Sequence, residues 1–241
     1  MSRFQLSRIS LYLFYLVSVI NLIEQIVKIG WLDMSTKPLL MPVLMIYYLS
    51  SKSQKTSSLS KLMIGALAFS WIGDILLMFQ GKLEGIFIFG LAAFLIAHVF
   101  YIFSYKLARF DVPQSQNRSF INTRIIFLIF IGMALIYMLY PTLGNLLVPV
   151  VLYTGVIITM GIFALLRRGW TIEKSFIMVY SGALLFIMSD AIIAINKFMN
   201  PIVQARLLIM ATYIAAQFLI VKGILAHENA DSEYQDGATE I

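Results

Sequence analysis

Residues 86–103 read IFIFGLAAFLIAHVFYIF, and they include no Asp, Glu, Lys or Arg and one histidine, His98. An apolar run of about 18 residues or more is long enough to cross the hydrocarbon core of a bilayer as a helix. The rest of the chain has the same character, because 60% of its 241 residues are hydrophobic and only 12% are charged. Soluble domains carry about 25% charged residues. The sequence therefore predicts an all-α, polytopic integral membrane protein.

Polar breaks divide the chain into eight apolar segments, each of which we expect to form one transmembrane helix. The segments are 9–28, 38–50, 61–79, 85–106, 124–140, 145–166, 174–196 and 203–222. The second segment is short, and Pro38 suits its first turn. We expect residues 1–226 to form one transmembrane domain. Residues 227–241 are acidic and lack apolar periodicity, which predicts a disordered tail.

The basic residues predict how the helices are oriented. If the N-terminus is cytoplasmic, thirteen of the 18 Lys and Arg residues fall on the cytoplasmic side. Cytoplasmic loops of membrane proteins carry such an excess, so both termini are expected inside the cell. The same loops account for the net charge of +6 without a nucleic-acid partner. The compact chain shows no targeting element, which favours a bacterial inner membrane as its location.

The composition also excludes several kinds of site. The chain has no cysteine, so disulfides, thiolate metal sites and cysteine nucleophiles are excluded. It has two histidines, of which His227 lies in the polar tail, so a multi-histidine metal site inside the membrane is excluded as well.

Four ionisable residues fall within the apolar segments and away from their ends, where a charged side chain costs roughly 3 kcal/mol on insertion scales. Glu24 lies near the outer end of the first segment and could reach the interface, whereas the other three lie deeper. Asp74 lies within FSWIGDILLMF (69–79), His98 within the fourth apolar segment and Asp190 within the seventh. At a rise of about 1.5 Å per residue, both aspartates lie roughly 8–10 Å below the outer boundary. Small residues flank all three, so we expect them to face the bundle interior, where the histidine is within reach of the aspartates.

These residues by themselves leave three functions open. Two carboxyls at one depth are suited to acid catalysis, while intramembrane Asp and His side chains are equally typical of a proton relay in a transporter. In the third reading, the aspartates only pair helices within a membrane scaffold.

Five sequence elements resemble a known family. They are KPLLMP (37–42), GDILLM (73–78), GLAAFLIAHVFY (90–101), SGALLFIMSDAIIAINKF (181–198) and YIAAQFLI (213–220). In this order they are similar to the YhhN/TMEM86 family, which is described as eight-spanning and whose characterised members are lysoplasmalogenases. The resemblance implies hydrolysis of the vinyl ether bond of a lysophospholipid, which yields a fatty aldehyde and glycerophosphocholine or glycerophosphoethanolamine.

The residues fit the chemistry that the resemblance implies. Acid-catalysed hydration of a vinyl ether passes through an oxocarbenium ion, as glycoside hydrolysis does, and needs a proton donor and a nearby anion. We expect Asp74 and Asp190 to supply these two groups, one protonated and one ionised. His98 would position or deprotonate water. No metal or organic cofactor is required.

The substrate-binding residues are predicted on the same basis. Lys37 is expected to hold the lipid phosphate, with a snorkelling interfacial lysine as the alternative. Five side chains are expected to support the site by hydrogen bonding, with plain interhelical bonds as the alternative: Tyr101, Ser189, Asn196, Tyr213 and Gln217.

Overall fold

The computed structural model describes residues 2–52, 57–80, 85–110 and 118–239, with side chains as far as residue 232. These residues form eight α-helices, one short 3-10 helix and no strand, which confirms the all-α prediction. The elements are α1 (Arg3–Val27), α2 (Gly30–Ser51), α3 (Ser58–Met78), α4 (Ile86–Leu107), α5 (Arg118–Leu143), η1 (Gly144–Leu146), α6 (Leu147–Leu165), α7 (Glu173–Phe198) and α8 (Ala205–Thr239). Each predicted apolar segment corresponds to one of the eight α-helices.

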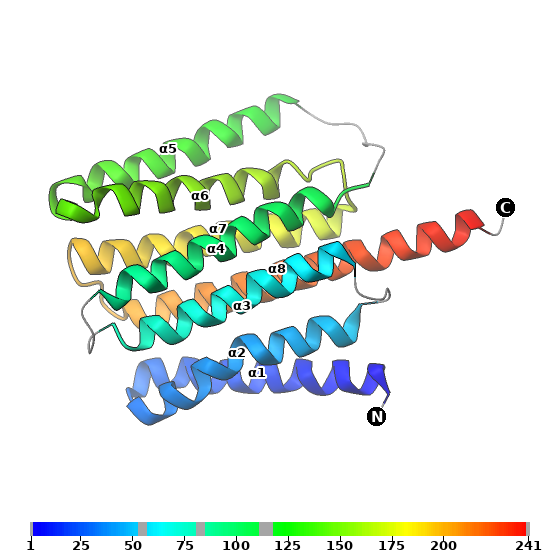
Figure 1. Ribbon diagram of the computed structural model, residues 1–241, viewed down its shortest axis with the longest axis horizontal. Coiled ribbons are helices and arrows are strands. Elements are labelled where there is room, and N and C mark those ends of the chain that lie inside the picture. Colours follow the sequence, from blue (N-terminus) through cyan, green and yellow to red (C-terminus); the bar gives the residue numbers. More distant parts are fainter. Residues whose placement is uncertain (1, 53–56, 81–84, 111–117, 240–241) are drawn as a thin grey trace.

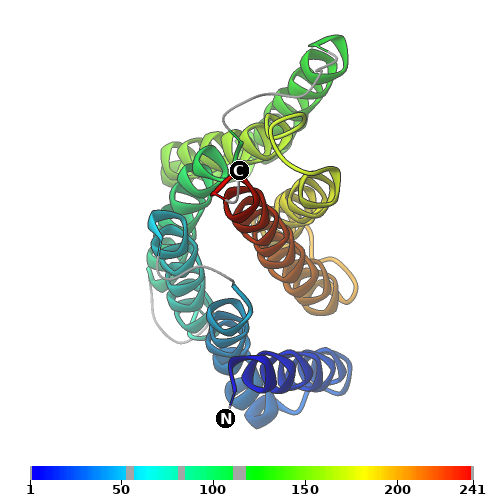
Figure 2. The same ribbon diagram turned by 90° about the vertical axis from the view of Figure 1, so that its right-hand side faces the viewer.

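Successive helices run in opposite directions and pack as neighbours (Figure 1). α1 and α2 lie at one side of the bundle, α5 and α6 lie at the other, and the pairs α3–α4 and α7–α8 lie between them (Figures 1 and 2). α1 begins and α8 ends at the same end of the bundle, which we call the terminal end. α1, α3, α5 and α7 end at the opposite, distal end.

The outer surface of the bundle is apolar. Many large hydrophobic side chains are exposed, including Tyr137 at 82%, Trp31 at 69% and Phe127 at 61%. Such a surface is expected to face lipid. By length and composition, six segments of the described chain could cross a membrane, and one of them, Arg118–Leu165, comprises α5, η1 and α6. The protein is therefore an integral membrane protein.

α2 begins at Gly30, earlier than predicted, and holds both Pro38 and Pro42 in its interior. Pro42 has no N–H to donate to the carbonyl of residue 38, four positions earlier. The indole Nε1 of Trp71 in α3 donates to this carbonyl of Pro38 at 2.7 Å. A neighbouring helix thus satisfies the backbone acceptor that Pro42 leaves unpaired, which is why the helix continues through the proline.

α8 continues through the region predicted to be a disordered tail. His227 and Glu228 are buried, with exposed fractions of 3% and 7%. Tyr48 donates to one carboxylate oxygen of Glu228 at 2.8 Å, and His227 Nδ1 lies 3.0 Å from the hydroxyl of Thr171. The expectation that disorder begins at residue 227 is wrong, because these polar residues have partners on other elements that a local composition argument does not include.

Arg167, in the α6–α7 connection, joins three helices at the terminal end. Its side chain is completely buried and donates to the carbonyl of Ala108 at 3.1 Å and to the hydroxyl of Ser175 at 2.8 Å. The Ser175 hydroxyl in turn donates to the carbonyl of Gly223 in α8 at 2.6 Å. Burial lowers the pKa of the Arg167 guanidinium to about 9, so it is still protonated near neutral pH and binds the carboxyl end of α4 as a cation.

Replacing Trp71 by Phe should destabilise the fold, because it leaves the Pro38 carbonyl without a donor. An unsatisfied buried acceptor costs about 1–3 kcal/mol. We expect Trp71→Phe to lower the melting temperature in detergent, measured by loss of monodisperse protein after heating. Trp31→Phe is the matched control, because Trp31 is exposed. Equal melting temperatures for the two variants would contradict the assigned role of Trp71.

Candidate active site

Aromatic rings fill the centre of the bundle between the α3–α4 and α7–α8 pairs. Phe94 of α4 meets Phe186 of α7 and Tyr213 of α8 edge to face, with ring centroids 6.3 and 5.9 Å apart. Phe186 and Tyr213 are also edge to face, at 5.5 Å. These rings form a rigid apolar frame around the polar residues that the sequence analysis singled out.

Asp74 is held at this centre by a tyrosine from another helix. Asp74 is only 3% exposed, and the Tyr213 hydroxyl donates a hydrogen bond to its Oδ2 at 2.7 Å. The preceding residue, Gly73, allows the ring of Phe94 to lie against the α3 backbone, since a Cβ at position 73 would be 2.6 Å from that ring. The Gly-Asp pair therefore combines a close helix approach with a buried carboxyl group.

Asp190 lies beside His98, as predicted. The Tyr153 hydroxyl of α6 donates to Asp190 Oδ2, and His98 Nε2 lies 3.9 Å from the same oxygen. His98 is completely buried, and neither ring nitrogen has a hydrogen-bond partner in the described part of the chain. Its ring is edge to face with those of Phe186 at 4.8 Å and Tyr153 at 5.4 Å.

A second polar layer lies one helical turn away from the Asp74–Tyr213 pair. Gln217 Nε2 donates to the hydroxyl of Ser70 at 3.0 Å, and Gln217 Oε1 accepts a hydrogen bond from the Tyr101 hydroxyl. Ser70 and Gln217 are each four residues from a member of the first layer, so the two layers stack along α3 and α8. Tyr101 and Gln217 therefore lie one helical turn from the Asp74–Tyr213 pair, and their part in the site stays a prediction.

Two predicted residues have their partners elsewhere. The Ser189 hydroxyl donates to the carbonyl of Ile209 at 3.2 Å, which joins α7 to α8. Asn196 Oδ1 accepts from the backbone N–H of Ile202 at 2.9 Å, in the connection between the same two helices. The structure brings neither of them into hydrogen bonding with an aspartate, and both bonds correspond to the alternative of plain interhelical contacts.

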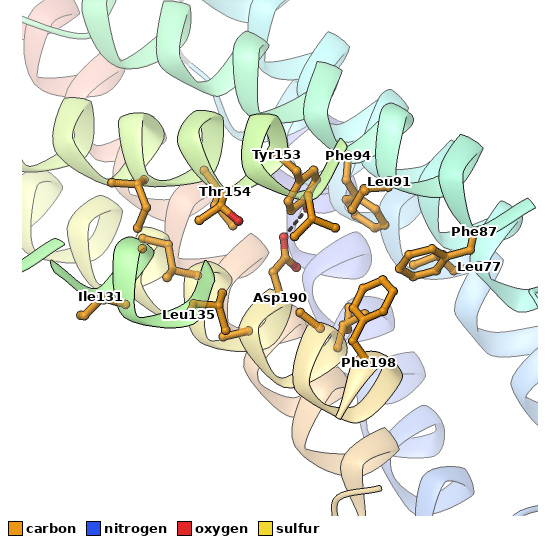
Figure 3. A pocket seen from close by; sticks show the side chains of 18 residues that line it. Leu77, Phe87, Leu91, Phe94, Ile131, Leu135, Tyr153, Thr154, Asp190 and Phe198 are labelled. Carbon is orange, nitrogen blue, oxygen red and sulfur yellow. Dashed lines mark hydrogen bonds between the residues drawn. The ribbon is translucent and has the colours of Figure 1, made fainter. Parts of the chain in front are cut away.

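An apolar cavity, which we call the slot, opens beside Asp190 (Figure 3). It lies between α4, α5, α6 and α7 and has an empty volume of about 730 Å³, including its open side. Its walls are mainly Leu, Ile, Val and Phe side chains, such as Leu91, Leu135 and Phe198. Asp190 projects into it toward Tyr153 and is the only ionisable acidic or basic group among the described lining residues.

A polar cavity, which we call the mouth, opens at the distal end and has an empty volume of about 1240 Å³, including open space. Lys37 and Asp33 of α2 line it, together with residues from α1, α3, α7 and α8. Leu77 and Ile193 line both the mouth and the slot, so the two cavities adjoin across these side chains, about one turn from the aspartates along α3 and α7.

The sequence analysis did not identify Tyr153 and Ser70 as site residues. Tyr153 is one of several tyrosines in apolar helices, and Ser70 is one of several small residues in α3. Their place in the site depends on how α6 packs beside α7 and how α3 faces α8. A tyrosine hydroxyl at the depth of a membrane aspartate is the signal that identifies Tyr153, because it needs a partner there.

Fold and site together define a helical membrane protein with two carboxyl groups buried between its helices, each of which accepts a hydrogen bond from a tyrosine. The chain belongs to the YhhN family, whose sequence profile matches residues 32–224. The family predicted from the sequence motifs is thereby confirmed.

Several relatives carry the name lysoplasmalogenase. The chain is 31% identical to lysoplasmalogenase TMEM86A of Bos taurus over 74% of its own length and 70% of the relative, and 32% identical to the Homo sapiens protein over 68% and 64%. It is 33% identical to a lysoplasmalogenase of Mycobacterium tuberculosis over 67% of its length and 59% of the relative. The chain thus aligns with about three fifths to seven tenths of these proteins. No solved structure is significantly similar to it.

Adding a methyl group at Gly73 should separate α3 from α4. The new Cβ would lie 2.6 Å from the Phe94 ring, which is itself packed by Phe186 and Tyr213. We expect Gly73→Ala to lower the melting temperature in detergent and to move Asp74 out of place. Gly155→Ala is the control, because nothing lies within 4 Å of a Cβ at Gly155. Alanine favours a helix by about 1 kcal/mol over glycine, so the control should be as stable as wild type or more so. A Gly73→Ala protein as stable as Gly155→Ala would contradict the close packing described here.

Proposed function

We propose that this protein hydrolyses the vinyl ether bond of lysoplasmalogens, such as lysoplasmenylethanolamine and lysoplasmenylcholine, to a fatty aldehyde and a glycerophosphodiester. The observation that carries the proposal is the pair of buried carboxyls, Asp74 and Asp190, at the junction of an apolar slot and a polar mouth. The lysoplasmalogenase relatives support the same activity and the enzyme class.

The order of the cavities matches the order of groups in the substrate. A lysoplasmalogen has a charged headgroup, then glycerol, then the vinyl ether, then a hydrocarbon tail. With the headgroup in the mouth and the tail in the slot, the vinyl ether lies near the junction formed by Leu77 and Ile193. The aspartates are one turn from this junction, which is where an acid catalyst is needed.

The reaction consumes one water molecule. A carboxylic acid first protonates the vinyl carbon that does not carry oxygen, which leaves an oxocarbenium ion. Water then adds to the carbon bearing oxygen and loses a proton to a base. The resulting hemiacetal loses its hydroxyl proton while the glycerol oxygen gains one, and the C–O bond to glycerol breaks to give aldehyde and alcohol.

We assign the proton donor to Asp190 and the stabilising anion to Asp74. Asp190 projects into the slot, where the alkenyl carbons would lie. Asp74 accepts a hydrogen bond from Tyr213, and this bond stabilises a negative charge on it. His98 has two unpartnered ring nitrogens beside Asp190, which suits it to orient the attacking water.

Aldehyde release by purified protein in detergent tests this assignment. Positioned acid–base groups contribute about 10²–10⁴-fold to rate, so we expect Asp74→Asn and Asp190→Asn each to lower kcat by about 100-fold or more. Both variants should remain folded, since Asn can accept the tyrosine hydrogen bond. Glu173→Gln is the control and should leave kcat unchanged. Glu173 is exposed at the first residue of α7, at the terminal end of the bundle.

Three outcomes would contradict parts of the proposal. Aldehyde release that survives both Asp→Asn changes would remove the carboxyl mechanism. Absence of aldehyde with well-folded wild type, over both headgroups and a range of pH, would remove the hydrolase. Proton uptake by proteoliposomes without any product would instead support the proton-relay transporter.

We also propose that all eight α-helices cross the membrane, with both termini in the cytoplasm. An even number of crossings agrees with the start of α1 and the end of α8 at one end of the bundle. The basic residues favour this end as the cytoplasmic one. α2 is not among the candidate spans found by composition, since it carries Asp33, Lys37 and two prolines, but it lies beside α1 and α3.

Labelling of single cysteines tests the topology, and the cysteine-free chain is a ready background. Lys61 at the start of α3 and Asn200 between α7 and α8 are exposed at opposite ends. In intact bacterial cells, a membrane-impermeant maleimide should label Asn200→Cys but not Lys61→Cys. Permeabilised cells should show labelling of both. Labelling of Lys61→Cys in intact cells would reverse the proposed orientation.

A further inference from the structure

The mouth contains an acidic cluster that a single arginine holds together. Arg206 Nη2 lies 3.2 Å from both carboxylate oxygens of Glu24 and 3.4 Å from Asp33 Oδ2. Gln25 joins the two acids as well, since its Nε2 lies 2.6 Å from Glu24 Oε2 and 3.1 Å from Asp33 Oδ1. One guanidinium thus faces two carboxyl groups, so a second cation could balance the remaining negative charge.

Asp33 is the member of this cluster that a ligand can reach. Its side chain is 22% exposed and lines the mouth, whereas the Glu24 side chain is completely buried behind it. Its position is fixed by Gln25 and by Asn21 Nδ2 at 3.4 Å. A carboxylate has about four lone-pair sites, so Asp33 can accept a further hydrogen bond from a ligand.

Two lysines supply the opposite charge on the same cavity. Lys37 of α2 and Lys197 of α7 both line the mouth, and no ion pair joins either of them to an acid in the described part of the chain. The Lys197 ammonium lies 5.2 Å from the ring centre of Phe87, which also lines the slot. No acid therefore neutralises either lysine through an ion pair in the described part of the chain, and both can bind an anion in the mouth.

We infer that the mouth selects a zwitterionic headgroup with a primary amine, with the phosphodiester between Lys37 and Lys197 and the ammonium on Asp33. The inference rests on the proposed function for the position of the lipid, and it adds the headgroup that the site prefers. A primary ammonium donates hydrogen bonds to a carboxylate, and such charge-assisted bonds are among the strong ones.

The wall of the mouth favours ethanolamine over choline. A quaternary ammonium cannot donate a hydrogen bond and is recognised by aromatic rings. None of the described residues that line the mouth is aromatic. A headgroup that ends in phosphate alone would leave Asp33 without its cation and would place a second negative charge near it.

Binding of non-cleavable analogues tests the inference independently of turnover. The probes are saturated 1-O-alkyl lysolipids, which lack the vinyl ether, with phosphoethanolamine, phosphocholine or phosphate headgroups. We expect wild type in detergent to bind the ethanolamine analogue about tenfold more tightly than either of the others, measured by displacement of a radiolabelled probe.

Substitutions at Asp33 and Lys197 distinguish the ammonium contact from the phosphodiester contact. Asp33→Asn should abolish the preference for ethanolamine, whereas Asp33→Glu should retain it, which shows that the loss is not a folding defect. Lys197→Gln should weaken the binding of all three analogues by a similar factor of about three to ten. Lys61→Gln at the terminal end is the matched control and should bind like wild type.

The outcomes distinguish this inference from the proposed function. Equal binding of the three analogues to wild type, or an unchanged preference in Asp33→Asn, would overturn the headgroup site even if aldehyde is released from a true substrate. The expected selectivity in a protein that releases no aldehyde would support the headgroup site and overturn the hydrolase.

Discussion

The structure depends on the need to satisfy two carboxyl groups inside a membrane-embedded bundle. An isolated polar group there is costly, and Asp74 and Asp190 each receive a hydrogen bond from a tyrosine on another helix. The donors Tyr213 and Tyr153 connect α3 to α8 and α6 to α7. The same two bonds therefore position the candidate catalytic groups and link helices from different parts of the chain.

The surrounding architecture makes those contacts possible. Gly73 lets the Phe94 ring reach the α3 backbone, and the ring then packs against Phe186 and Tyr213. At the distal end, Trp71 supplies the hydrogen bond that Pro42 cannot, so α2 remains helical and carries Asp33 and Lys37 to the mouth. An apolar slot and a polar mouth thus adjoin the two buried acids, and this arrangement supports the proposed function.

The sequence allowed the helices and the central residues to be predicted because the bilayer imposes strong local rules. Backbone groups in lipid must bond within their own segment, so long apolar runs become helices. Ionisable side chains at that depth must face the protein interior, which identified Asp74, His98 and Asp190. Local rules failed for the start of α2 and for the continuation of α8 beyond residue 226, where His227 and Glu228 have hydrogen-bond partners distant in the chain, such as Tyr48 for Glu228.

The sequence by itself thus determined the class of protein, the approximate helices, the family and the buried acids, since each follows from composition or from a short motif. Only the tertiary structure decided the partners: Tyr153 for Asp190, Tyr213 for Asp74, Ile209 rather than an aspartate for Ser189, and Arg206 for Glu24. The reason is physical, because a hydrogen bond between helices depends on their relative rotation and depth. Those are set by packing across the whole bundle and not by the residues near either partner.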